Sequence, residues 1–176
     1  MESTKNHARK AGALFLSGFA ALALQIPLAS AADFGMGVAF EGSGSTVMVP
    51  IKTNTLLIEP QLQFDNSSAT GSTFKNINPG VGVYLRKELG PLFESYMGGR
   101  VAYDQNKQTF PGGDFKSTSF SLGPTFGVQH FFSKQFSLGL DASLIYTNGK
   151  QTSSGQPDVH FHSLSTETRV LLRAFF

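Results

Sequence analysis

The sequence predicts an all-β protein, an eight-stranded antiparallel barrel that crosses a membrane. Three observations predict it. Polar and apolar residues alternate along most of the chain, the connections between alternating segments are short at one end and long at the other, and the alternation runs to the last residue. A strand places successive side chains on opposite sides of its sheet, so this pattern indicates a sheet between an apolar and a polar medium.

The first segment, residues 1–31, has the pattern of a cleaved secretory signal. Basic residues precede an apolar stretch from Ala11 to Leu24, and Ala29-Ser30-Ala31 supplies a small-x-small cleavage pattern. An uncleaved anchor is the alternative, but Gln25 and Pro27 interrupt the stretch before the roughly 20 apolar residues that a spanning helix needs. We therefore expect the rest of the chain, 32–176, to be exported as one domain.

Charge and cysteine content exclude two classes of function. The signal holds three of the 14 basic residues (Lys5, Arg9 and Lys10) and one of the 12 acidic ones (Glu2), so the remainder is neutral. Nucleic-acid binding depends on clustered positive charge, so no nucleic-acid partner is expected. The chain has no cysteine, which excludes disulfides and thiol chemistry. No motif indicates a cofactor.

Alternation and turn signals place eight strands in order. They lie near residues 33–41, 46–51, 54–64, 77–88, 92–105, 115–132, 135–147 and 162–176. The second has the weakest support, because it is short and contains Pro50. An even number of strands returns the C-terminus to the side of the N-terminus, and closure of the last strand on the first leaves no unpaired edge in lipid.

The connections alternate in kind. Leu89-Gly90-Pro91 and Ser133-Lys134-Gln135 read as tight turns, whereas 65–76, 106–114 and 148–161 are polar and rich in Gly, Ser, Thr and Asn. Short periplasmic turns and long extracellular loops are typical of outer-membrane barrels. We therefore expect the three long segments to be extracellular loops.

A soluble barrel with its apolar face inward would show the same alternation, but two further features favour the membrane barrel. Aromatic residues recur ten positions apart on the apolar face, as Phe93 and Tyr103, and as Phe136 and Tyr146. Ten residues at ~3.3 Å and a tilt of roughly 40° span about 25 Å, the height of the apolar band on such barrels. Glycines gather on the polar parity, where a narrow interior is crowded. They are Gly35, Gly37, Gly80, Gly82, Gly98, Gly123, Gly127 and Gly139.

Three prolines fit this interpretation less well. Pro60, Pro79 and Pro124 lie within predicted strands, where each removes a ladder donor that lipid cannot replace. We expect bulges, or water on the lumen side, to accommodate them.

The final strand carries a resemblance to a known family. One of its faces has no charge and ends in Phe176; it comprises Leu164, Thr166, Thr168, Val170, Leu172, Ala174 and Phe176. This pattern resembles the closing strand of bacterial outer-membrane barrels, where the terminal aromatic helps the assembly machinery to recognise the chain. With its signal, strand number and inward charges, the chain resembles the small outer-membrane β-barrel superfamily, which includes OmpX, the opacity proteins and the membrane domain of OmpA.

The resemblance is one of architecture and covers the whole exported chain. It implies an outer-membrane location, contact with outer-membrane lipid and lipopolysaccharide, and assembly by the outer-membrane barrel machinery. We expect a monomer.

The polar parity contains equal numbers of acidic and basic side chains. They are Glu59, Glu94, Asp141 and Glu167, and Arg86, Arg100, Arg169 and Arg173. Charges in a narrow lumen must be paired or hydrated, so we expect a structural plug of ion pairs. The alternative is a gated pore whose pairs exchange partners. A three-residue turn at 89–91 would place Arg86 directly opposite Glu94.

Enzymatic function has little support. Some eight-stranded barrels modify lipid A, and the deacylases among them carry a His-x-Ser-Asn stretch on a late strand. The similar stretch here, Ile145-Tyr146-Thr147-Asn148, has isoleucine in place of the histidine. Without a base beside the hydroxyl there is no activated nucleophile, so we expect no catalytic residue.

A weak metal-site pattern occurs before the last strand. Asp158, His160 and His162 have the spacing that could bring a carboxylate and two imidazoles towards one Zn²⁺. No fourth ligand is identifiable, so we expect ordinary polar residues at the rim of the barrel and no bound metal.

Function in such a scaffold usually lies in the connections. We expect a structural or surface-recognition role through the segments 65–76, 106–114 and 148–161, with an extracellular ligand that the sequence does not identify. The alternatives are a narrow solute or ion channel and a lipid A-modifying enzyme.

Overall fold

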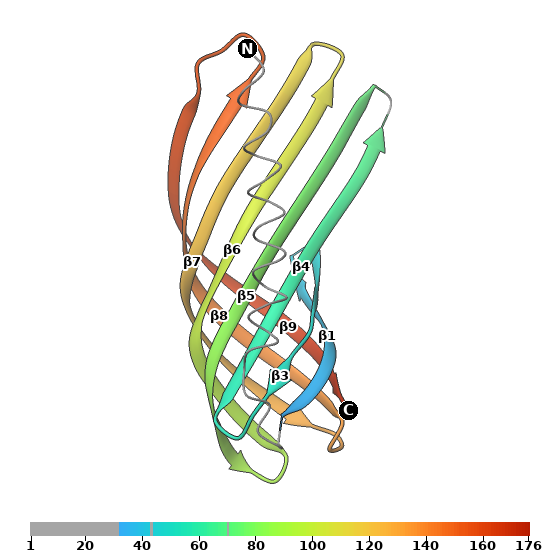
Figure 1. Cartoon of the computed structure of the whole chain (residues 1–176), viewed down its shortest axis with the longest axis vertical. Helices are drawn as coiled ribbons and strands as arrows, with labels where there is room; N and C mark the ends of the chain where they lie inside the picture. The colour runs from blue at the N-terminus through green and yellow to red at the C-terminus, as the bar shows by residue number, and fades with distance from the viewer. Residues whose placement is uncertain (1–31, 43, 70) are drawn as a thin grey trace. The chain divides into compact units, whose positions relative to one another are not determined.

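The computed structural model describes residues 32–42, 44–69 and 71–176, so the predicted signal, 1–31, lies outside the described residues. This part of the chain contains nine strands: β1 (Asp33–Glu41), β2 (Gly44–Met48), β3 (Ile51–Lys52), β4 (Leu56–Ala69), β5 (Ser72–Gly90), β6 (Phe93–Phe110), β7 (Gly113–Phe131), β8 (Phe136–Ser153) and β9 (Val159–Phe175). They form one antiparallel sheet that closes where β1 pairs with β9 (Figure 1). No helix long and apolar enough to cross a membrane occurs in the described residues.

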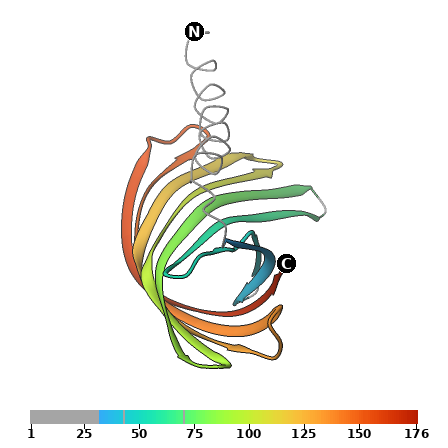
Figure 2. The ribbon, with the colours of Figure 1, turned by 60° about the horizontal axis from the view of Figure 1, so that its bottom comes forward.

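The ring has eight positions, as predicted, because β2 and β3 occupy one of them. Both pair with β1 in a single register, and both pair with β4 in a single register. Only Val49 and Pro50 separate the two pieces, and backbone hydrogen bonds cross the break. Gly35 donates to the Pro50 carbonyl and Val49 donates to the Pro60 carbonyl, each at 2.9 Å. Figure 2 shows the ring of strands with its lower end turned forward.

The three prolines are accommodated without the expected bulges. At Pro79 the β5–β6 pairing lapses between Gly80 and Ile77 and resumes in the same register, while the β4–β5 pairing continues past it. At Pro124 the β7–β8 pairing lapses in the same way, while the β6–β7 pairing continues. Pro60 lies opposite the break between β2 and β3. Each proline therefore interrupts the ladder on one side only, which is where its missing N–H would have donated.

The prediction of three long loops is wrong. The segments 65–76, 106–114 and 148–161 lie mostly in strands, because the hairpins β4–β5, β6–β7 and β8–β9 continue as paired ladders far beyond the predicted strand ends (Figure 1). The connection between β6 and β7 is only residues 111–112. Gly71 and Gly155 have φ of 78°, a left-handed conformation that suits glycine in a tight turn. Hairpin pairing satisfies the backbone there, so a polar composition did not produce an irregular loop.

The predicted register of the β5–β6 turn is also wrong. The structure has a bulge between Glu88 and Gly90, with Glu88 opposite Glu94 and Gly90 opposite Phe93. Arg86 therefore lies opposite Tyr96, two positions from the predicted partner. The connection is residues 91–92 rather than 89–91, which moves the pairing three positions along β6, and the extra residue of the bulge moves it back by one.

The two faces of the sheet have the predicted character. The four inward arginines, their acidic partners, Tyr84 and Tyr96 point into the barrel, and large apolar side chains cover its outside. The aromatic residues spaced ten positions apart are exposed on the outer face, and we call the two levels that they mark the aromatic girdles. They are Phe93, Tyr103, Phe136 and Tyr146. The final two residues show the alternation clearly, since Phe175 is 4% exposed and Phe176 is 76% exposed. An apolar exterior around a polar interior is the arrangement of a barrel surrounded by lipid.

Glycines on the inward parity make room for aromatic rings. A Cβ on Gly127 would overlap the ring of Tyr96, which lies directly opposite on the neighbouring strand. A Cβ on Gly82 would overlap the Tyr84 side chain. The two tyrosine rings then meet edge to face with centroids 5.3 Å apart.

The wall is uneven in height because the first hairpin is short. β1 meets β9 only from Gly35 to Phe40, and β2 meets β4 only at Val47 and Met48. Above that level, within the described residues, β4 from residue 63 and β9 from 159 to 169 have a strand partner on one side only. The two strands that flank the short hairpin thus each carry one unpaired edge.

Candidate functional site

The barrel interior holds all eight charged residues of the predicted lumen set. The structure brings them together as four ion pairs: Arg86–Glu94, Arg173–Glu59, Arg169–Asp141 and Arg100–Glu167. Every pair joins two strands, and three of the four arginines pair with a residue far away in sequence. Ion pairs therefore cross the lumen between charges that the alternation of the strands directs inward.

Arg173 lies at the centre of the most buried cluster. Its Nε donates to Glu59 Oε1 at 2.6 Å and its Nη2 donates to Glu59 Oε2 at 3.0 Å. Nη1 donates to Gln129 Oε1 at 2.9 Å, and the guanidinium lies 5.0 Å from the centroid of the Tyr96 ring. The Arg173 and Glu59 side chains are 0% and 1% exposed. Such a pair is stable only when hydrogen bonds satisfy its remaining donors and acceptors, as they do here.

Glu94 joins this cluster to the turn end of the barrel. Its carboxylate accepts hydrogen bonds from Arg86 and, at 2.8 Å, from Gln129 Nε2, and Lys52 Nζ lies 3.4 Å away. Lys52 also sits over the rings of Phe131 and Phe175, at 4.5 and 5.1 Å from their centroids. Gln129 thus connects Glu94 with Arg173, so the lower lumen is one continuous network.

Two further ion pairs lie above this network. Arg169 binds Asp141 with two hydrogen bonds, of 3.0 and 2.7 Å, and its Nη1 donates to Gln61 Oε1 at 3.0 Å. Arg100 binds Glu167, whose side chain is 29% exposed. The Arg100–Glu167 pair is therefore the most exposed of the four, whereas Arg169–Asp141 is as buried as Arg173–Glu59.

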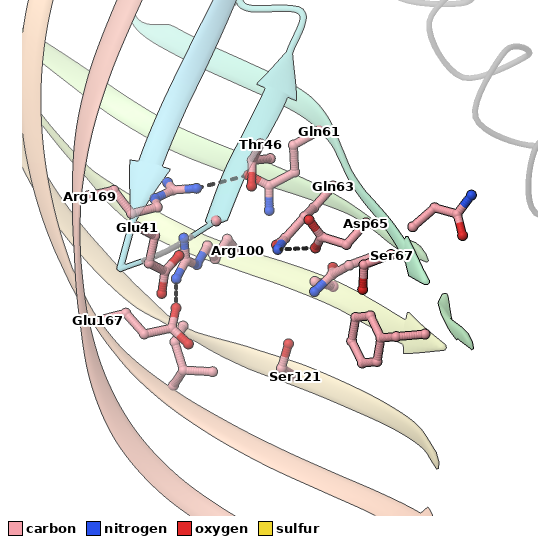
Figure 3. A pocket seen from close by; sticks show the side chains of 16 residues that line it. Glu41, Thr46, Gln61, Gln63, Asp65, Ser67, Arg100, Ser121, Glu167 and Arg169 are labelled. Atoms are coloured by element: carbon pink, nitrogen blue, oxygen red, sulfur yellow. Dashed lines mark hydrogen bonds and ion pairs between the residues drawn. The ribbon is translucent and has the colours of Figure 1, made fainter. Parts of the chain in front are cut away.

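A polar cavity of about 580 Å³ lies above the ion pairs, towards the long hairpins. Arg100, Glu167 and Arg169 contribute to its lining together with Gln63 and Asp65 (Figure 3). Gln63 donates to Asp65 at 3.0 Å, so part of this lining is already paired. The interior thus holds an ion-pair network in its lower part and a cavity towards the hairpins.

Sequence reasoning missed four members of the network. They are Lys52, Gln61, Tyr96 and Gln129. Each has the inward parity of its strand or lies near a turn where a polar side chain can enter the lumen. That position in the alternation is the sequence signal that could have identified them. An uncharged amide attracts no notice in a search for compensating charges, although Gln129 connects two of the ion pairs.

The remaining candidate residues show no catalytic or metal-binding arrangement. Ile145, in the stretch compared with deacylases, points inward and is 3% exposed. Asp158 accepts a 2.7 Å hydrogen bond from Thr152 and pairs with Lys150, and hydrogen bonds from Lys150 and Thr152 hold the pKa of its carboxyl below its usual range. Within the described residues no three His, Cys, Asp or Glu side chains gather closely enough to hold a metal ion.

Solved structures with a similar fold are outer-membrane and surface proteins. Neisserial surface protein A aligns with a TM-score of 0.53 and 20% identity, over 82% of this chain and 94% of that one. A major outer membrane protein from Thermus thermophilus aligns with a TM-score of 0.49 and 15% identity, over 83% of this chain and 100% of that one. Ail, the attachment invasion locus protein of Yersinia pestis, aligns with a TM-score of 0.44 and 14% identity, over 82% and 93%.

No protein-family model matches the chain, and no curated protein matches it in sequence. At 20% identity the likeness to Neisserial surface protein A concerns the fold, which agrees with the strand ring, the polar lumen and the apolar exterior described above. The chain therefore has the fold of a small outer-membrane β-barrel.

Proposed function

We propose that this protein is a sealed, non-enzymatic barrel that presents a polar cavity and three long hairpins at the cell surface for structural or recognition purposes. The observation that carries the proposal is the continuous network from Lys52 and Arg86 through Glu94 and Gln129 to Arg173. These side chains fill the lower lumen, and tyrosine rings fill the space beside them. A channel requires a continuous polar path, and paired charges packed across the lumen support a closed barrel instead.

The orientation follows from the two ends. The termini of the barrel and the connections 53–55, 91–92 and 132–135 lie at one end, and the long hairpins lie at the other (Figure 1). Barrels of this class place their turns and termini in the periplasm. The cavity and the hairpins then face the outside, where an exposed scaffold meets ligands.

Conductance in planar bilayers tests the sealed lumen. We expect no stable current steps from the purified protein, because displacing Arg173 from Glu59 and Gln129 would strand buried charges. Flotation of the same preparation with liposomes verifies that the barrel has inserted. Reproducible steps from inserted protein would contradict the proposal and favour the channel. Mass spectrometry of lipid A from cells with and without the gene tests the enzyme alternative, and we expect identical spectra.

A further inference from the structure

The outer face of the barrel carries lysines above its apolar surface. Four neighbouring strands, β5 to β8, supply one each: Lys75, Lys107, Lys116 and Lys150. Each has the parity of the exposed apolar residues on its own strand, so all four point away from the lumen. We call Lys75, Lys107 and Lys116 the lysine row.

The members of the lysine row meet directly across the ladder. Lys75 pairs with Lys107, and Lys107 pairs in turn with Lys116. Directly opposite side chains on one face of a sheet have Cβ atoms about 5 Å apart, and like charges in such positions destabilise the pairing. Three ammonium groups in this arrangement are favourable only when anions lie between them.

Acidic side chains compensate only part of this charge. Lys107 Nζ lies 3.3 Å from Asp114 Oδ2, and Lys150 pairs with Asp158. In the part of the chain that the structure describes, neither Lys75 nor Lys116 has an ion-pair partner. The two outer members of the lysine row therefore remain available to an external anion.

The lysine row lies at a defined height. Each member is two to four residues beyond the last outward apolar side chain of its strand. These side chains are Ile77 for Lys75, Tyr103 for Lys107 and Phe120 for Lys116. At ~3.3 Å per residue and a tilt of roughly 40°, the separation along the barrel axis is about 5–10 Å. Lipid headgroups lie at this height, just outside the hydrocarbon core.

We propose that the lysine row binds the phosphate groups of lipopolysaccharide in the outer leaflet. The proposal rests on the orientation argued under the proposed function, which puts the long hairpins outside the cell. A phosphorylated glycolipid satisfies both parts of this surface at once, since its phosphates meet the ammonium groups and its acyl chains lie against Ile77, Tyr103 and Phe120 below them. A free phosphate satisfies only the first part, so the lipid is the occupant that the whole surface fits.

The other end of the barrel provides a matched control. Lys87 and Lys134 are also exposed lysines outside the apolar band, but Lys87 lies opposite Ser95 and Lys134 lies in the 132–135 turn, so they form no row. Replacing these two removes the same charge from the periplasmic end.

The test titrates fluorescent diphosphorylated lipid A into the folded barrel in a neutral maltoside detergent. We expect K75Q/K116Q to bind about 10- to 30-fold more weakly than the wild type, and K87Q/K134Q to bind as the wild type does. Lipid A stripped of its phosphates should bind the wild type and K75Q/K116Q equally. Unboiled gel mobility verifies that both variants are folded, which is expected because all four side chains are exposed.

Equal affinity of K75Q/K116Q and the wild type, or equal weakening in both variants, would overturn the proposal. Competition by inorganic phosphate at the concentrations at which lipid A binds would overturn the assignment to lipid. Neither result bears on conductance, so failure here is distinguishable from failure of the sealed-lumen proposal.

Discussion

A single residue, Arg173, shows how a full charge is held in a lumen too narrow for bulk water. Its guanidinium is completely buried, yet Glu59, Gln129 and Tyr96 accept its hydrogen bonds from three other strands. The attraction between the two charges contributes little net stability, whereas the loss of one of them leaves an unpaired buried charge, which is strongly destabilising.

A double-mutant cycle on Arg173 and Glu59 measures this. We expect Arg173→Met alone and Glu59→Gln alone each to lower the free energy of unfolding by about 3–5 kcal/mol, because each leaves an uncompensated buried charge. The double variant should lose much less than the sum of the two. Urea titration of the barrel in detergent micelles gives all four values, and simple additivity would argue against a coupled pair.

At this scale the sequence predicted which charged residues enter the lumen and one of the pairs, Arg86–Glu94, but not the other three. Parity alone placed Arg86 and Glu94 inside. They meet diagonally, with Tyr96 rather than Glu94 opposite Arg86, because the turn lies at residues 91–92 and not at 89–91, and the bulge at Leu89 offsets only one residue of that shift. Partner choice depends on register and on side-chain reach, and neither is visible in the periodicity of one strand.

The strands are the scale at which membrane and water can be told apart. On β8 the outward residues change from Leu140 and Leu144 to Tyr146 and then to Asn148. The apolar part matches a hydrocarbon layer, the tyrosine matches its boundary, and the asparagine lies beyond it.

Leu140→Arg tests this assignment. Its side chain is 51% exposed on the outer face, so arginine would enter the hydrocarbon layer and lower the free energy of unfolding by about 2–4 kcal/mol. Asn148→Arg is the matched control, on the same face of the same strand but above the tyrosine, and should cost about 0–1 kcal/mol. Refolding into lipid vesicles across a urea gradient compares them; equal losses would mean that the boundary is misplaced.

The same alternation explains why the predicted strands end several residues before the observed ones. Between the upper girdle and the hairpin tips both faces meet water, so Asn66, Ser67 and Lys75 carry no apolar signal and resemble a loop. The structure nevertheless pairs Asn66 with Lys75 and Ser67 with Phe74. Backbone pairing continues there because each strand has its hairpin neighbour, a tertiary fact that composition does not record.

The whole molecule has one joint that differs from all the others. Its long hairpins each connect neighbours in sequence, but the ring is completed by strands from the two ends of the chain, over the short span from Gly35 to Phe40. A ladder that is short and non-local contributes little hydrogen bonding against a large loss of chain entropy.

We expect the pairing between β1 and β9 to open more often in the native state than the pairing within the hairpins. We expect a sub-global opening in which β1 separates from β9 while the long central hairpins stay intact, so that amide deuteration reaches Met36 and Val38, whose N–H groups face β9, well before the middle of β6 and β7. Hydrogen exchange of the detergent-solubilised barrel, read by NMR or by mass spectrometry of peptides, would show two classes of protection; uniform protection around the ring would mean that the seam is as firm as the hairpins. A barrel with one early-opening seam releases its strands in a fixed sequence, starting with the first and the last to leave the ribosome.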